Sequence, residues 1–183
     1  MEHQTIMFKK HKIYKKKISG IDLNKVSEEF FDEIEFFSKF TSSDTVMKPN
    51  IRKMNEICFD ELKSIYEEEL SLKIKSGCQK SWFFYAPPKS NNLGNYHTHQ
   101  QLSDRYPEIY SDYVWTFYLK TPNNCVGNEG KLAFKDGDDE FFVDVEEGYI
   151  YSFGYSLLHK GVEAPNSDLE RLVAVGNVAF KFE

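Results

Sequence analysis

The chain has 183 residues, a formal net charge of −6 and 40% hydrophobic residues, a composition typical of a folded globular domain rather than a disordered chain. The acidic balance argues against nucleic-acid binding, and three cysteines without a CxxC spacing argue against a zinc finger or a disulfide framework. Residues 1–17 lack the apolar core of a signal peptide, and no window is apolar enough to span a membrane. We therefore expect one cytoplasmic domain, with residues 1–79 supporting a core formed by residues 80–183.

The chain begins with a basic segment, from about Thr5 to Ile18, which we expect to add one strand to a sheet. Lysines crowd this segment: Lys9, Lys10, Lys12, Lys15, Lys16 and Lys17. Lysines commonly protect an exposed strand edge from pairing with other chains. A polyanion-binding site is the alternative.

Two amphipathic helices are predicted next. From Asn24 to Phe40, apolar residues recur at helical spacing and acidic residues occupy the other side. Phe59–Ile74 has the same pattern, and Asn55 or Asp60 is expected to cap its N-terminus. We expect the aromatic stripe of the first helix to pack on a sheet.

From Lys80 onward, apolar and polar residues alternate with a period of two, which is typical of strands. The predicted strands are Ser81–Tyr85, Asn95–Gln100, Tyr113–Lys120, Gly130–Lys135, Glu140–Asp144, Tyr149–Phe153 and Leu169–Phe182. Many short strands separated by turn residues favour a barrel or a sandwich. Because the helices precede the strands, the predicted class is α+β, with the helices backing one sheet.

A polar segment from Gln100 to Asp112 is too long for a tight hairpin. Loops at a barrel mouth commonly form substrate lids. Asp104 or Arg105 is then a candidate for a substrate contact, and an ordinary solvated connection is the alternative.

The histidines provide the main chemical signal. His97 and His99 are two positions apart, so on a strand both rings point to the same face. His159 follows a predicted strand and is placed to reach the same end of a small barrel. Imidazole is a ligand for iron, zinc, copper and nickel. The three histidines therefore predict a mononuclear metal site, although a His-x-His pair alone also occurs by chance on a surface.

Arg171 lies near the start of the last predicted strand, among apolar residues. In one interpretation it is a surface residue of an alternating strand. In the other it points inward, where its planar guanidinium would hold a carboxylate through two parallel hydrogen bonds. Beside a metal site, we favour the inward interpretation.

From about Trp82 to the end, the chain resembles the Fe(II)- and 2-oxoglutarate-dependent oxygenases with a double-stranded β-helix core, especially the prolyl-4-hydroxylase-like group. The pattern of that group is an aromatic strand, a HxD or HxE pair, glycine-containing strands, a distal histidine and then an arginine or lysine. The matching residues occur in the same order: Tyr85, His97, His99, Gly130–Phe134, Gly148–Gly154, His159, Val162, Pro165 and Arg171.

The resemblance implies a jelly-roll or cupin-like barrel with the N-terminal helices packed on one sheet. It also implies Fe(II), 2-oxoglutarate as co-substrate, O2, and hydroxylation of a small-molecule or peptidyl substrate with release of succinate and CO2. Arg171 would hold the distal carboxylate of 2-oxoglutarate. Tyr85 and Tyr118 would lie near the co-substrate, with a role as core aromatics the alternative for each.

The chain departs from the family pattern at one ligand, because His99 occupies the position of the usual carboxylate. His99 could coordinate the metal directly, Asp104 could supply the carboxylate, or His99 could lie beside an incomplete site. We favour His99 as the ligand and keep Asp104 as the alternative. Two other functions stay open: a three-histidine cupin-type dioxygenase that does not use 2-oxoglutarate, and a non-catalytic β-helix binding module.

Overall fold

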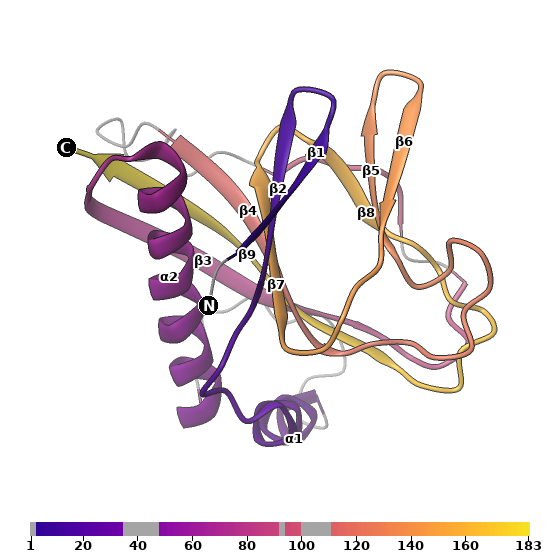
Figure 1. Ribbon diagram of the computed structural model, residues 1–183. Coiled ribbons are helices and arrows are strands. Elements are labelled where there is room, and N and C mark those ends of the chain that lie inside the picture. The colour runs from indigo at the N-terminus through magenta and orange to yellow at the C-terminus, as the bar shows by residue number, and fades with distance from the viewer. Residues whose placement is uncertain (1–2, 35–47, 92–93, 100–110) are drawn as a thin grey trace.

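The computed structural model describes residues 3–34, 48–91, 94–99 and 111–183. Two helices and nine strands are formed within these ranges (Figure 1). In chain order they are β1 (Gln4–Phe8), β2 (His11–Lys17), α1 (Leu23–Ile34), α2 (Pro49–Leu70), β3 (Ile74–Ala86), β4 (Ser111–Lys120), β5 (Leu132–Asp136), β6 (Asp139–Val143), β7 (Tyr149–Gly154), β8 (Leu158–Gly161) and β9 (Arg171–Phe182).

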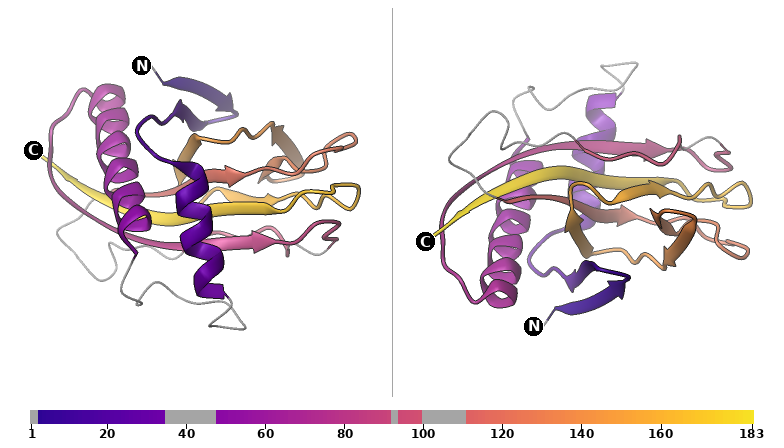
Figure 2. Two further views of the ribbon diagram at one scale, coloured as in Figure 1. Left: turned by 90° about the horizontal axis from the view of Figure 1, so that it is seen from below. Right: turned by 90° about the horizontal axis from the view of Figure 1, so that it is seen from above.

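The strands form two antiparallel sheets. The larger has six strands in the order β1-β2-β7-β4-β9-β3, and the smaller has three in the order β6-β5-β8. Both helices cover one face of the larger sheet, and the smaller sheet lies on the other side (Figure 1). Figure 2 shows that the helix axes run across the direction of the strands. The predicted α+β class, with helices on one sheet, is confirmed.

The alternation of side chains along each strand creates two separate cores. Along β9, Leu172 and Ala174 pack toward the helices, whereas Val173 between them packs toward the smaller sheet. The same alternation on β4 separates Phe117 from Tyr118. We call the second core, between the two sheets, the inter-sheet core.

The second helix begins earlier than predicted, so neither expected cap is correct. Asn55 and Asp60 both lie inside α2, which begins at Pro49. The free backbone N–H groups of its first turn donate instead to a carboxylate of α1: Glu29 accepts hydrogen bonds from Asn50 and Ile51. Such a cap comes from tertiary packing and leaves no local signal in the sequence. The end of the first predicted helix, residues 35–40, lies outside the described residues.

The basic segment forms a hairpin rather than the single strand predicted. Lys9 adopts a left-handed conformation, with φ of 51°, between β1 and β2. Four lysines of this hairpin form ion pairs with carboxylates elsewhere in the protein: Lys9 with Asp139, Lys12 with Glu69, Lys15 with Glu146 and Lys16 with Glu61. These ion pairs argue against a polyanion site, and β1 does lie at a sheet edge.

The predicted strands that correspond to β4, β5, β6, β7 and β9 agree with the structure to within two residues at each end. Three differences matter for the site. The segment Asn95–Gln100 contributes only an isolated bridge at His97, with Gln100 outside the described residues. The short strand β8, which carries His159, was not predicted. β3 begins at Ile74, so the expected division between residues 79 and 80 falls inside a strand.

None of the helices in the described ranges has the length and apolar composition that crossing a membrane requires.

We predict that Gly176→Ala destabilises the fold. A Cβ atom at Gly176 would lie 2.5 Å from the ring of Trp115, which is fully buried on the neighbouring strand. Overpacking of this kind typically costs about 1–3 kcal/mol. Urea denaturation should show a lower midpoint for this variant. Gly154→Ala is the matched control, since among the described residues no atom beyond its chain neighbours lies within 4 Å of the added Cβ, and a midpoint equal for both variants would contradict the prediction.

Candidate metal centre

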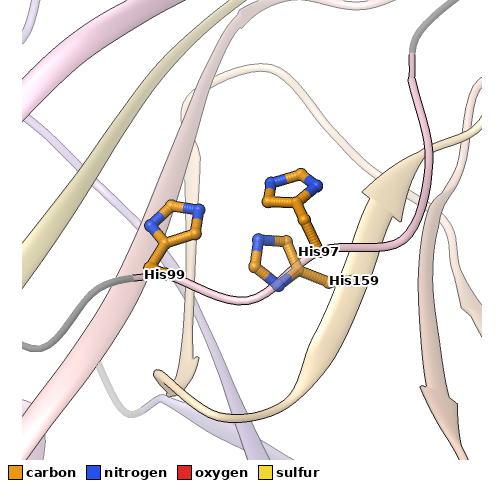
Figure 3. Close-up of side chains that lie close together, drawn as sticks. All are labelled: His97, His99 and His159. Carbon is orange, nitrogen blue, oxygen red and sulfur yellow. The ribbon is translucent and has the colours of Figure 1, made fainter.

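Three histidine rings meet at one point of the molecule. The ring centroids are 4.6 Å apart for His97 and His159, 4.9 Å for His99 and His159, and 5.4 Å for His97 and His99. One possible ligand nitrogen from each ring lies within 4.8 Å of the others. Figure 3 shows a nitrogen of each ring turned toward the same space between the rings. Histidines from two distant parts of the chain therefore converge.

The backbone positions these rings. His97 and His159 exchange two hydrogen bonds, from His97 N to His159 O (3.1 Å) and from His159 N to His97 O (3.0 Å). The N–H of His99 donates to the carbonyl of Tyr155 (3.3 Å), in the turn between β7 and β8. The segment that carries His97 and His99 is thus attached to β8 although it forms no regular strand.

In each histidine the nitrogen nearer the backbone already has a partner. The Nδ1–H groups of His97 and His159 donate to the carbonyls of Asn95 (3.1 Å) and Leu157 (2.9 Å). Nδ1 of His99 lies 2.5 Å from the side-chain oxygen of Asn177. A carbonyl oxygen can only accept, so Nδ1 carries the proton and the Nε2 lone pair is left for a metal.

Burial keeps two of these ligands neutral. His159 is 3% exposed, and burial lowers its pKa to about 3. Burial also lowers the pKa of His99 below its ordinary value. Because a metal ligand must be deprotonated, both rings are ready to bind an ion at neutral pH without first losing a proton.

The donor set fits a single transition metal ion. Neutral imidazole suits iron, zinc, copper and nickel. With metal–nitrogen bonds of about 2.1 Å, two ligands of one ion are at most about 4.2 Å apart. The observed limit of 4.8 Å therefore requires only a small inward movement of the rings.

Arg171 is buried in the inter-sheet region, with 3% of its surface exposed. One guanidinium nitrogen, Nη2, donates to the carbonyl of Val162 (2.8 Å). The other two, Nε and Nη1, are buried and have no partner among the residues that the structure describes. A buried charged donor without an acceptor is costly, so this side chain fits an anion that completes its hydrogen bonds. The inward orientation favoured from sequence is the one observed.

The two tyrosines expected near the co-substrate lie on opposite faces of the larger sheet. Tyr118 belongs to the inter-sheet core and is close enough to Arg171 for each to affect the pKa of the other. Burial raises the pKa of Tyr118 to about 12, so its hydroxyl stays protonated. Tyr85 contacts Phe30 and Phe31 of α1 on the helix-covered face, which places it away from the histidines.

Two side chains that contact the ring of His99 were missed in the sequence. Trp82 lies on the inter-sheet face of β3, with its ring 5.3 Å from that of His99, and Asn177 contacts the same histidine from β9. The period of two places Trp82 on the face opposite Tyr85, and that alternation is the one signal that could have found it. Asp104 and Arg105 lie outside the described residues.

Neither the family models nor the curated proteins give a match to this chain. Among solved structures, a prolyl-4-hydroxylase of Pseudomonas putida is similar, with a TM-score of 0.62 and 16% identity over 95% of this chain and 89% of that one. The viral collagen prolyl hydroxylase vCPH of Paramecium Bursaria Chlorella virus-1 is also similar, with a TM-score of 0.60 and 16% identity over 90% of this chain and 89% of that one. A structure of vCPH described as a 2OG complex gives a TM-score of 0.57 at 15% identity, over 90% of this chain and 94% of that one. The resemblance to prolyl-4-hydroxylases is thereby confirmed at the level of the fold.

We predict that His159 makes the metal-free protein sensitive to acid. In the unfolded chain its pKa is about 6.5, whereas in the folded protein it is about 3. As the pH falls below 6.5, the unfolded chain takes up a proton that the folded protein does not. Stability is therefore lost between these values, at up to about 1.4 kcal/mol per pH unit.

The measurement is urea denaturation in the presence of a chelator, at several pH values from 7 to 4. His159→Gln should reduce the slope of stability against pH over this range. Parallel curves for the variant and the original protein would show that His159 is not the group responsible.

Proposed function

We propose that this chain is an Fe(II)- and 2-oxoglutarate-dependent dioxygenase that hydroxylates a small-molecule or peptidyl substrate and releases succinate and CO2. The observation that carries the proposal is the pairing of two features. One is the set of three histidines whose Nδ1 atoms already have partners and whose rings converge, and the other is a buried guanidinium with two nitrogens that have no partner among the described residues. A metal centre and a carboxylate site together match what 2-oxoglutarate requires.

The strand arrangement supports a double-stranded β-helix for this enzyme. Four of the six strands of the larger sheet, β7-β4-β9-β3, lie side by side, and β6-β5-β8 lies on the other side of the inter-sheet core. The bridge between His97 and His159 adds the segment 95–99 beside β8, which makes the smaller sheet four segments wide. Four strands of one antiparallel sheet facing four segments of another across a core are the arrangement of a jelly roll, with β1 and β2 extending the larger sheet.

In this proposal the chain supplies ligands, orientation and a dry environment. His97, His99 and His159 would hold Fe(II), and together with 2-oxoglutarate this ion would supply the activation of O2. Arg171 fixes the far carboxylate of 2-oxoglutarate through Nε and Nη1, since Nη2 is occupied by Val162. Phe153 packs 4.7 Å from the His159 ring and helps to exclude water from that ligand.

Tyr118 and Tyr85 have different roles in this proposed enzyme. Tyr118 lies beside Arg171 with its proton retained, so it can donate to a carboxylate held there. Tyr85 has no part in co-substrate binding, because it packs against α1. Its role as a core aromatic is the interpretation that the geometry favours.

A three-histidine dioxygenase that does not use 2-oxoglutarate is the second candidate, and it is favoured by the presence of His99 where the family has a carboxylate. The two candidate enzymes differ at Arg171, because an enzyme that does not use 2-oxoglutarate needs no buried arginine to bind a carboxylate. A non-catalytic module with no bound metal is the third candidate. The convergence of the three rings argues against that third reading.

We predict that Fe(II) and 2-oxoglutarate together, but neither alone, produce a weak visible charge-transfer band under anaerobic conditions. His97→Ala and His159→Ala should abolish the band and succinate formation. His11→Ala is the matched control, because His11 lies on β2 beside Asp136 and not at the centre. Metal uptake without any effect of 2-oxoglutarate would favour the second candidate, and no uptake would favour the third.

We predict that Arg171→Leu raises the 2-oxoglutarate concentration at half-maximal band intensity while metal affinity stays the same. Loss of a hydrogen bond to a charged group costs about 1.5–3 kcal/mol, which corresponds to roughly 10–100-fold. Arg171→Lys keeps the positive charge but lacks the planar fork. Its 2-oxoglutarate concentration at half-maximal band intensity should therefore lie between those of the original protein and Arg171→Leu. An unchanged 2-oxoglutarate requirement in Arg171→Leu would rule out the clamp.

A further inference from the structure

His99 is supported differently from the other two histidines. The rings of His97 and His159 donate to backbone carbonyls two residues earlier, those of Asn95 and Leu157. The equivalent carbonyl for His99 is that of His97, and it already accepts the N–H of His159. The ring of His99 uses instead the side chain of Asn177, which is 78 positions away in the sequence.

Asn177 is held in place by the sheet. It lies in β9 between β3 and β4, where its register partners are Lys80 and Val114. It is 9% exposed, and its side chain points to the inter-sheet face, as do Val173 and Val175. A central strand cannot shift without breaking both ladders, so the backbone from which the amide reaches His99 is fixed.

The ring of His99 has a second constraint. The indole of Trp82 lies against it, with centroids 5.3 Å apart and ring planes at 32°. Trp82 limits rotation of the ring, and Asn177 determines which nitrogen carries the proton. Together they direct Nε2 toward the space shared with His97 and His159 (Figure 3).

We propose that Asn177 is a positioning residue that makes His99, rather than Asp104, the third metal ligand. Its amide oxygen fixes the tautomer with the proton on Nδ1, so that the Nε2 lone pair faces the ion. This inference rests on the proposed function for the identity of the physiological metal. It requires only a divalent ion at the three rings, so it can be tested without 2-oxoglutarate or substrate.

The amide also sets the charge of the site. A carboxylate behind an imidazole makes the ring a stronger base and a more strongly bound ligand. An amide keeps the orientation without adding negative charge. Asn177→Asp should therefore keep or increase metal affinity, whereas Asn177→Leu, of similar size but without an acceptor, should reduce it.

The experiment is titration of the metal-free protein with Co(II), followed by its visible absorption bands. Loss of a partner behind a histidine ligand typically lowers metal affinity about 10–100-fold. We expect a loss of that size and an altered spectrum for Asn177→Leu and for His99→Ala. We expect no change for Asp104→Asn. Thr116→Val is the matched control, because it removes a buried hydroxyl at the register position next along β4 on the same face.

A second readout does not depend on metal. In the metal-free protein, nitrogen NMR of the histidine rings should show His99 with its proton on Nδ1, and a mixture of tautomers in Asn177→Leu. If that variant does not fold, Asn177→Asp carries the test: it should bind Co(II) at least as tightly as the original protein. Weaker binding by Asn177→Asp would overturn the proposal.

Two further outcomes would also overturn it. One is an unchanged Co(II) affinity and tautomer in Asn177→Leu, and the other is a loss of Co(II) binding in Asp104→Asn with full binding in His99→Ala. These results are separate from the test of the proposed function. A protein whose Co(II) binding depends on Asn177 but which shows no band with Fe(II) and 2-oxoglutarate would keep this inference and lose the dioxygenase.

Discussion

The candidate site depends on the pair of backbone hydrogen bonds between His97 and His159. His97 lies in a segment without regular structure, whereas His159 lies on a four-residue strand that pairs with β5. The two bonds attach the irregular segment to that strand and place both side chains on the same side of it. Without them, the position of His97 relative to His159 would be left to loop conformation, and loops are the least constrained part of a fold.

The last strand connects the site to the rest of the fold. One face of β9 packs against the helices through Leu172 and Ala174, and the other carries Arg171 and Asn177 into the inter-sheet region. The helices therefore contribute to the site although they are remote from it. They cover the apolar face of the sheet in which β9 pairs with β3 and β4, and so they stabilise the strand that carries both side chains.

Most of the architecture could be predicted because buried strands form short runs of aromatic and β-branched residues that are bounded by turn residues. β4 and β7 agree closely with the prediction for this reason. β8 was missed because four residues are too few to show a period, and the start of β3 was missed because polar residues occupy its exposed end. The start of α2 was missed because its cap is Glu29, a residue of another helix.

The site could be predicted in part, for a different reason. The histidines and Arg171 have side chains whose chemistry is unusual in an apolar setting, so they are noticed in the sequence without any structure. Asn177 is an ordinary polar residue in a strand, and its importance comes only from a contact across 78 positions. Tyr85 was assigned to the site by its place in a motif, but its register with Leu172 puts it on the helix-covered face.

The neutral charge of the three histidine ligands affects which small molecules the site prefers to bind. Three imidazoles with a neutral amide behind one of them add no negative charge, so a bound divalent ion keeps its full charge within the site. A carboxylate in place of His99 would lower the net charge of the ion and its protein ligands by one. The remaining coordination positions therefore attract anions more strongly. Arg171 adds a second, buried positive charge in the same inter-sheet region. A ligand with a carboxylate at each end would have a cationic partner for both, which is the electrostatic argument for the dicarboxylate that we propose as co-substrate.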